Sequence, residues 1–365
     1  MQLLPFRATL PNLKFITAPE AFFSTVKEDY LEYAASGFFT NTEDPGFYIY
    51  RIEQGHKIFT GLIACVDMQA DGGQHIIPHE QTLATKEQRQ IHLLLKRKAT
   101  VKPVLLTYQA QDKINFALHQ FCQSLPILDL TFERAQQKHT VWAVTRQEDQ
   151  KAIRDLFNAF VPKAYIADGH HRCATAKRLS QGKQHSPFSK TVCAFFPSSD
   201  LEIHDFNRVI DAFSDCSPTY FMARLSQYCN IQVVDAPYKP RKKHELLLYI
   251  NKEWYQLEWK SSIFGEDQFD PKSLDSLLLN EIILKEILGI EDISNSPRIS
   301  YIEGPKGLKG LQKKTVEKDT RIGIALYPVQ THELFDLADR SVILPPKSTW
   351  FEPRLINGLI NYQYD

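Results

Sequence analysis

Two adjacent histidines and an arginine follow a glycine in the stretch YIADGHHRCATAKRLS, residues 165–180. The apolar residues before the glycine predict a strand, and the residues after it predict a helix. Asp168 can cap that helix, and Gly169 permits a tight turn. The backbone N–H groups at the start of a helix form an anion site, and Arg172 adds a planar set of donors that matches phosphate. The stretch therefore predicts a site for a phosphate group.

The two histidines of this stretch, His170 and His171, point in different directions because they are neighbours in the chain. One can face a ligand while the other braces the loop. An arginine in the first turn of a helix opposes the helix dipole, and a bound anion would offset that cost. A capped helix with two solvated histidines is an equally good interpretation of these residues taken alone.

A second candidate is PHEQT, residues 78–82, which precedes a predicted helix at 86–98. Glu80 follows His79 in this loop, where a carboxylate can face a cleft. A glutamate exposed on the surface is the simpler interpretation of this short motif.

A third candidate is PPKSTWFEPR, residues 345–354. Its prolines and aromatic residues can fix the loop rigidly, which leaves Lys347, Ser348 and Thr349 to reach a ligand. A C-terminal segment that only packs against the protein explains the stretch equally well.

The elements that must position these residues can be predicted from the pattern along the chain. The stretches 47–52 and 57–68 are rich in β-branched and aromatic residues and predict a β-hairpin across EQGH. Further strands are predicted at 104–108, 190–197 and 201–210, and a second hairpin with a tight Asn251–Lys252 turn at 244–260. This order predicts a mixed α+β architecture with a domain boundary near residue 215.

The composition limits the class of protein. Lys+Arg and Asp+Glu are both 43, and this neutral balance argues against a nucleic acid as the main partner. The basic runs at 96–98 and 238–245 are interpreted as solvated faces. Six cysteines without a C-x-x-C pair, no signal peptide and no apolar run of about 18 residues predict a cytoplasmic protein with reduced thiols and no membrane span.

Over almost its whole length the chain resembles the bacterial family "domain of unknown function 1015", whose members are described as ParB-like or SpoOJ-like. The matching stretches are PFRA (5–8), GLIACVDM (61–68), PHEQTLATKEQR (78–89), YIADGHHRCATA (165–176), DFNRV (205–209), ALYPV (325–329) and PPKSTWFEPRLINGL (345–359). The family implies no settled activity.

The order P-H-E, helix, strand and D-G-H-H-R is also distantly similar to the core shared by ParB, sulfiredoxin and the free-serine kinases. Sulfiredoxin chemistry needs a cysteine where this chain has His170, and no helix-turn-helix segment of the ParB kind follows. The kinase pattern D-G-H-x-R matches through Arg172, and the kinase H-E pattern matches Glu80. This resemblance implies a ParB/sulfiredoxin-like mixed-sheet core in residues 1–215 with an insertion at about 109–162. A second α+β domain would span 216–365, with a tail (345–359) that returns to the site.

The leading hypothesis is a nucleotide-dependent phosphotransferase that uses ADP or ATP with Mg²⁺ and acts on a small hydroxylated metabolite, with free serine as the first candidate. In it, Glu80 is the general base beside His79, Asp168 caps the turn or holds Mg²⁺, and the phosphate lies on Gly169, His170, His171 and Arg172.

Two alternatives stay open. One is a non-catalytic, ParB-like protein that senses a nucleotide through the same site. The other is a metal-dependent hydrolase in which His79, Glu80, His170 and His171, with His204 and Asp205, gather around a metal. A homo-oligomer is compatible with each of these three hypotheses.

Overall fold

The computed structural model describes residues 1–69, 74–180, 186–214, 216–264 and 273–364. The chain forms two compact units, of which the first comprises Met1–Glu202 and Pro353–Asp365 and the second Ile203–Glu352. The division falls ahead of the boundary expected near residue 215, and residue 215 itself lies outside the described residues. In the described ranges no helix combines the length and the apolar character needed to cross a membrane.

The first unit is built on a nine-stranded mixed sheet with the order β6-β11-β8-β12-β5-β4-β10-β9, to which β1 adds beside β5. Its strands are β1 (Leu3–Leu4), β4 (Phe47–Gln54), β5 (Lys57–Asp67), β6 (Ile76–Ile77), β8 (Val104–Tyr108), β9 (Leu128–Phe132), β10 (Gln137–Val144), β11 (Ala164–Asp168) and β12 (Lys190–Pro197). The pairs β6–β11 and β8–β12 are parallel and the other pairs are antiparallel. The predicted α+β class with a mixed sheet is therefore confirmed.

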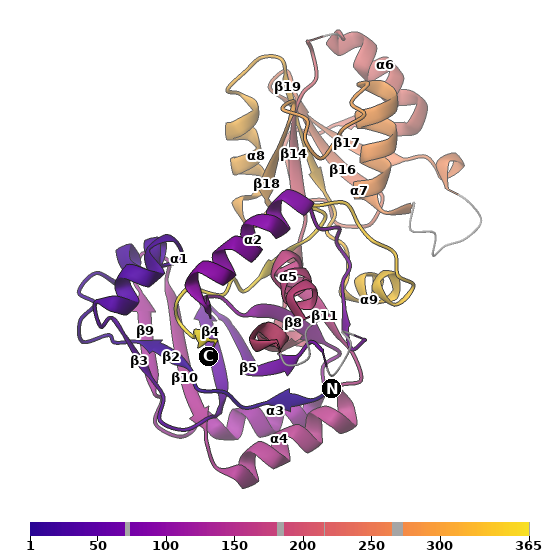
Figure 1. Cartoon of the computed structure of the whole chain (residues 1–365). Helices are drawn as coiled ribbons and strands as arrows, with labels where there is room; N and C mark the ends of the chain where they lie inside the picture. The colour runs from indigo at the N-terminus through magenta and orange to yellow at the C-terminus, as the bar shows by residue number, and fades with distance from the viewer. Residues whose placement is uncertain (70–73, 181–185, 215, 265–272, 365) are drawn as a thin grey trace. The chain divides into compact units, whose positions relative to one another are not determined.

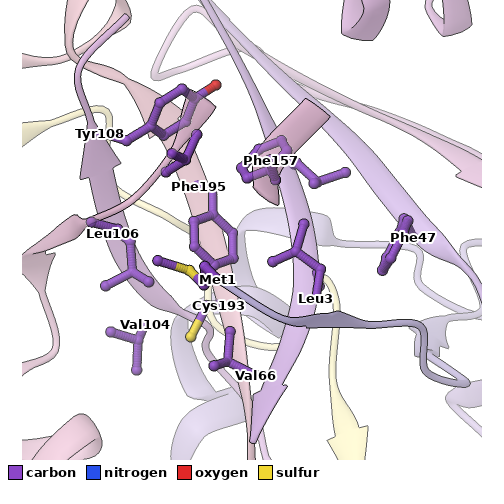
Figure 2. Close-up of a cluster of buried hydrophobic side chains, with 14 of the residues drawn as sticks. Met1, Leu3, Phe47, Val66, Val104, Leu106, Tyr108, Phe157, Cys193 and Phe195 are labelled. Atoms are coloured by element: carbon purple, nitrogen blue, oxygen red, sulfur yellow. The ribbon is translucent and has the colours of Figure 1, made fainter. Parts of the chain in front are cut away.

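Helices cover this sheet and share its core. They are α1 (Pro19–Ala35), α2 (Ala84–Arg97), α3 (Asp112–Phe121), α4 (Gln147–Phe160) and α5 (His170–Ser180). Helices α3 and α4 lie side by side, and α5 contacts both β8 and β12 (Figure 1). The core runs from Leu3 and Phe47 through Val104 to Phe157 and Phe195 (Figure 2). Because these residues come from the sheet and from the helices on it, burial of one apolar cluster fixes the strands that carry the candidate site.

The segment at 109–162, expected as an insertion, consists of α3, β9, β10 and α4. Strand β10 pairs with β4 from Gln137↔Gln54 to Val144↔Phe47, and β9 forms the outer edge of the sheet. The segment therefore extends the central sheet and supplies two of the helices that cover it.

The second unit contains a six-stranded antiparallel sheet with the order β15-β17-β16-β19-β14-β18. Its strands are β14 (Phe206–Asp211), β15 (Cys229–Val233), β16 (Glu245–Ile250), β17 (Glu253–Trp259), β18 (Ile299–Glu303) and β19 (Arg321–Leu326). Its helices include α6 (Pro218–Tyr228), α8 (Gly307–Thr315) and a helix at 275–287 that continues α7 with π-type turns. Because β14 pairs with β18 and β19, this strand belongs to the second unit and moves the boundary ahead of residue 203.

The last residues of the chain belong to the first unit. Strand β21 (Tyr362–Gln363) pairs with β7 (Ala99–Thr100), and the backbone of Asn361 exchanges hydrogen bonds of 2.9 and 3.0 Å with Thr9. Gly358 donates its N–H to the carbonyl of Val101 at 2.7 Å. The predicted tail at 345–359 is thus divided, with its residues up to Glu352 in the second unit and the rest in the first.

Candidate functional site

The D-G-H-H-R turn joins the end of β11 to the start of α5, as predicted. Asp168 is the last residue of β11, after a register shift between Ile166 and Asp168 against β8. Gly169 has a φ of +105°, in the region that favours glycine, and its carbonyl accepts the N–H of Cys173 at 2.9 Å. The backbone N–H groups of the first turn of α5 therefore have no acceptor within the helix.

The carboxylate of Asp168 is surrounded by three cationic side chains. Its Oδ2 lies 3.1 Å from Lys102 Nζ and 3.1 Å from Arg172 Nη2, and its Oδ1 lies 3.4 Å from Arg354 Nη1. Burial acts to raise the pKa of Asp168, but the three cations together hold this pKa well below its usual value. Asp168 is therefore ionised, and the group of four keeps a surplus of positive charge.

These four residues line a cavity of about 300 Å³ that lies wholly within the first unit. Five cationic side chains and a single carboxylate are found among its described lining residues, and the cations are Lys27, Arg97, Lys102, Arg172 and Arg354. The whole chain is neutral, so this surplus is local. A partly enclosed, strongly cationic cavity is suited to an anionic ligand.

Lys102 is the most buried cation of the Asp168 group, with a side chain that is 13% exposed. Burial lowers its pKa to about 8, although the neighbouring Asp168 acts in the opposite direction. Lys102 therefore carries its charge at neutral pH and loses it as the pH rises through about 8.

The two histidines of the turn contact the loop before α2 and are not among the residues that line the cavity. The backbone N–H of His79 donates to His170 Nε2 at 3.5 Å, and the two rings lie at 90° with their centroids 4.5 Å apart. His171 Nε2 accepts the N–H of Leu83 at 3.1 Å. Burial lowers the pKa of His170 to about 4, so this ring is neutral at physiological pH. His170 and His171 thus connect the D-G-H-H-R turn to the loop before α2, which lies about 90 residues earlier in the chain.

Glu80 lies near the start of α5 because the preceding residue, His79, packs there. It follows His79, whose ring packs against the first residue of α5, but Glu80 does not line the cavity. The structure therefore brings the P-H-E loop to the D-G-H-H-R turn and leaves the carboxylate of Glu80 outside the cationic cavity.

The three polar residues expected from the tail lie in the second unit. Lys347 Nζ lies 4.9 Å from the centre of the Phe206 ring, and the Ser348 hydroxyl donates to the carbonyl of Pro345 at 2.8 Å. Thr349 is buried in the same unit. Arg354, at the end of the same PPKSTWFEPR stretch, is the residue that lines the cavity.

Of the five cations that line the cavity, only Arg172 was predicted from the sequence as a site residue. The run at 96–98 was expected to be solvated, and this is wrong for Arg97, which is half-buried and lines the cavity, whereas Lys96 and Lys98 are exposed. Lys102 directly precedes Pro103 and Arg354 directly follows Pro353, and neither residue was among those that the motifs predicted to reach a ligand. Lys27 belongs to none of the sequence motifs that predicted a site.

A magnesium ion on Asp168 does not fit this arrangement. Both carboxylate oxygens contact cations, and a divalent cation there would have to displace them. Among the residues that the structure describes, no three His, Cys, Asp or Glu side chains are grouped as metal ligands, and His204 and Asp205 belong to the second unit.

Comparisons with known proteins found a matching family and several similar solved structures. The sequence model of the family described as "Protein of unknown function (DUF1015)" matches residues 7–277. No curated protein matches the chain. Of the solved structures that are similar, SbnI with a C-terminal truncation, from Staphylococcus aureus, shares 10% identity at a TM-score of 0.44, with 81% of this chain and 85% of that chain covered.

Two further solved structures are similar at comparable levels. A free serine kinase in complex with AMP shares 14% identity at a TM-score of 0.38, over 81% of this chain and 90% of that chain. A conserved hypothetical protein from Pyrococcus furiosus shares 15% identity at a TM-score of 0.37, over 81% of this chain and 94% of that chain. These similarities are distant, and they assign no role to a residue of this chain.

Proposed function

The chain belongs to the DUF1015 family, and from this premise and the geometry of its first unit we propose that it binds a phosphorylated small molecule, with ADP or ATP as the ligand. The observation that carries the proposal is the cavity in which five cations accompany one carboxylate. Arg172 and Arg354 offer the planar donor sets that match phosphate oxygens, and Lys102 adds a compact charge. The volume of about 300 Å³ is at the lower end for small-molecule sites, which suits a small phosphorylated compound.

We further propose that the bound nucleotide serves as a phosphoryl donor to a small hydroxylated metabolite. The hydroxyl oxygen of the acceptor forms a bond to phosphorus, and the bond from phosphorus to the bridging oxygen of the nucleotide breaks. Glu80 takes the proton of the acceptor hydroxyl, and the cations of the cavity neutralise the charge on the transferred group. In support, the contacts of His79 with His170 and of Leu83 with His171 hold the loop of Glu80 against the start of α5.

A non-catalytic nucleotide sensor is the second candidate, and one observation favours it. Glu80 is not among the lining residues of the cavity, so the cations can bind a nucleotide without a carboxylate positioned for proton transfer. This candidate expects binding with slow or absent turnover.

The first test measures binding. We expect ADP, ATP or pyrophosphate at about 100 times its Kd to raise the melting temperature of the purified protein by about 5 °C. Calorimetry then gives the affinity, and incubation with nucleotide, Mg²⁺ and serine or other hydroxylated compounds reveals any phosphorylated product. Indifference of the folded protein to all three phosphates would overturn the proposed function, and binding without product would favour the sensor.

The close approach of Gly169 to Arg172 supplies a second test. A Cβ at position 169 would lie 2.5 to 2.9 Å from the Arg172 guanidinium, which would have to move. We expect Gly169→Ala to weaken pyrophosphate binding about tenfold, because a displaced guanidinium loses one charge-assisted hydrogen bond. Calorimetric titration measures this change.

Gly37→Ala is the matched control. Gly37 also has a positive φ, +78°, but a Cβ there would meet no atom within 4 Å. Both variants are expected to lose about 1 to 2 kcal/mol of stability from the backbone conformation, and only Gly169→Ala should lose affinity. Equal affinities in the two variants would show that the position of Arg172 does not matter for the ligand.

A further inference from the structure

Two buried threonines line the cavity, and their hydroxyls have no hydrogen-bond partner among the described residues. Thr175 on α5 is 2% exposed and Thr191 on β12 is 3% exposed, and both line the cavity. Among the described residues, neither Oγ1 atom has a partner, and the same is true of Nε of Arg172. Buried polar groups are almost always partnered, so a molecule in the cavity is a candidate partner for these three groups, which have none among the described residues.

The hydroxyl of Thr175 does not use the partner that its helix offers. A threonine inside a helix can donate to the carbonyl four residues earlier, as Thr315 in α8 does to Leu311 at 2.8 Å. Thr175 also lies within a helix, and its Oγ1 makes no such bond within the described residues. The hydrogen-bonding capacity of this buried hydroxyl is therefore not used by the described residues.

We propose that Thr175, Thr191 and the Nε of Arg172 form a hydroxyl-recognition site, which selects phosphate esters that keep a free hydroxyl group. This inference rests on the proposed function, because the same ligand places its phosphate on the cations. A hydroxyl group both donates and accepts, so it can accept the N–H of Arg172 and pair with either threonine, each of which can donate or accept. The ligand class is therefore a hydroxylated phosphate ester.

The test replaces each hydroxyl by a methyl group of similar size, as Thr175→Val, Thr191→Val and both together. Three probes are titrated by calorimetry: glycerol 3-phosphate, propyl phosphate, which has no free hydroxyl, and pyrophosphate. We expect the wild-type protein to bind glycerol 3-phosphate at least about tenfold more tightly than propyl phosphate. Each single variant should reduce this preference by about threefold to tenfold, and the double variant should abolish it.

Two controls separate recognition from structure. Thr107 in β8 is also buried, at 1% exposed, with no partner for its Oγ1 among the described residues, but it does not line the cavity. Thr107→Val should therefore leave the preference unchanged. Pyrophosphate affinity should stay within about twofold in all variants. Their melting temperatures should not fall, because valine removes a buried hydroxyl that has no partner in the part of the chain that the structure describes.

The outcomes distinguish this inference from the proposed function. Pyrophosphate binding without a preference for glycerol 3-phosphate over propyl phosphate would overturn the hydroxyl-recognition site and leave the role of the cations standing. A preference that survives in the double variant, or that Thr107→Val removes equally, would also overturn it. If none of the three probes binds, the inference falls, and the titrations with ADP and ATP decide the proposed function.

Discussion

Glu80→Gln is expected to slow phosphoryl transfer by about 100- to 10,000-fold, the range that a positioned general base supplies. Glutamine keeps the size of the side chain and removes its ability to take the proton of the acceptor hydroxyl. Because Glu80 does not line the cavity, nucleotide affinity should stay within about twofold. Product formation under saturating nucleotide and calorimetric affinity are measured on the same preparation.

Glu148→Gln is the control for this prediction. Glu148 lies in the first turn of α4, is strongly exposed and does not line the cavity. The Glu148→Gln variant should transfer phosphate at the wild-type rate. Transfer that persists in Glu80→Gln would remove Glu80 from the mechanism, and a loss of nucleotide binding in the same variant would mean that Glu80 contacts the ligand directly.

Arg172→Gln should weaken the binding of pyrophosphate and of ADP by about 10- to 100-fold, the second largest effect that we expect. The loss of a charge-assisted hydrogen bond to phosphate costs about 1.5 to 3 kcal/mol, which corresponds to this range. The fold should persist, because Asp168 keeps Lys102 and Arg354 as partners. The dependence of affinity on salt should also become shallower, since one fewer cation meets the ligand.

Arg178→Gln tests whether the loss is specific to the cavity. Arg178 lies six residues further along α5, is 57% exposed and pairs with Glu87 at 3.5 Å without lining the cavity. Both variants remove one positive charge from the same helix. Equal losses of affinity in the two would indicate a general effect of net charge, and no loss in Arg172→Gln would remove the guanidinium from the phosphate site.

The parts of the fold that could be predicted are those set by local pattern. The strands predicted at 104–108 and 190–197 coincide with β8 and β12, and the hairpin across EQGH forms β4 and β5. The turn at Asn251–Lys252 has φ values of +50° and +69°, as a two-residue hairpin turn requires. In each case the pattern of side chains within about ten residues determines the element.

The composition of the site could not be predicted in the same way. The D-G-H-H-R turn was found because its residues are neighbours in the sequence, but Lys102 and Arg354 reach Asp168 only through sheet order and the return of the chain end. Those contacts depend on pairings between distant segments, which a local pattern does not encode. The histidines illustrate the same point, since their partners His79 and Leu83 lie about 90 residues away.

The return of the chain end to the first unit has a consequence for biosynthesis. Arg354 follows the whole of residues 203–352, so a ribosome exposes α5 and β12 long before it delivers this arginine. At about 5 to 20 residues per second, the nascent first unit waits on the order of ten seconds for its last cation. A polypeptide that terminates early within the second unit therefore carries the D-G-H-H-R motif but never gains the full complement of positive charge.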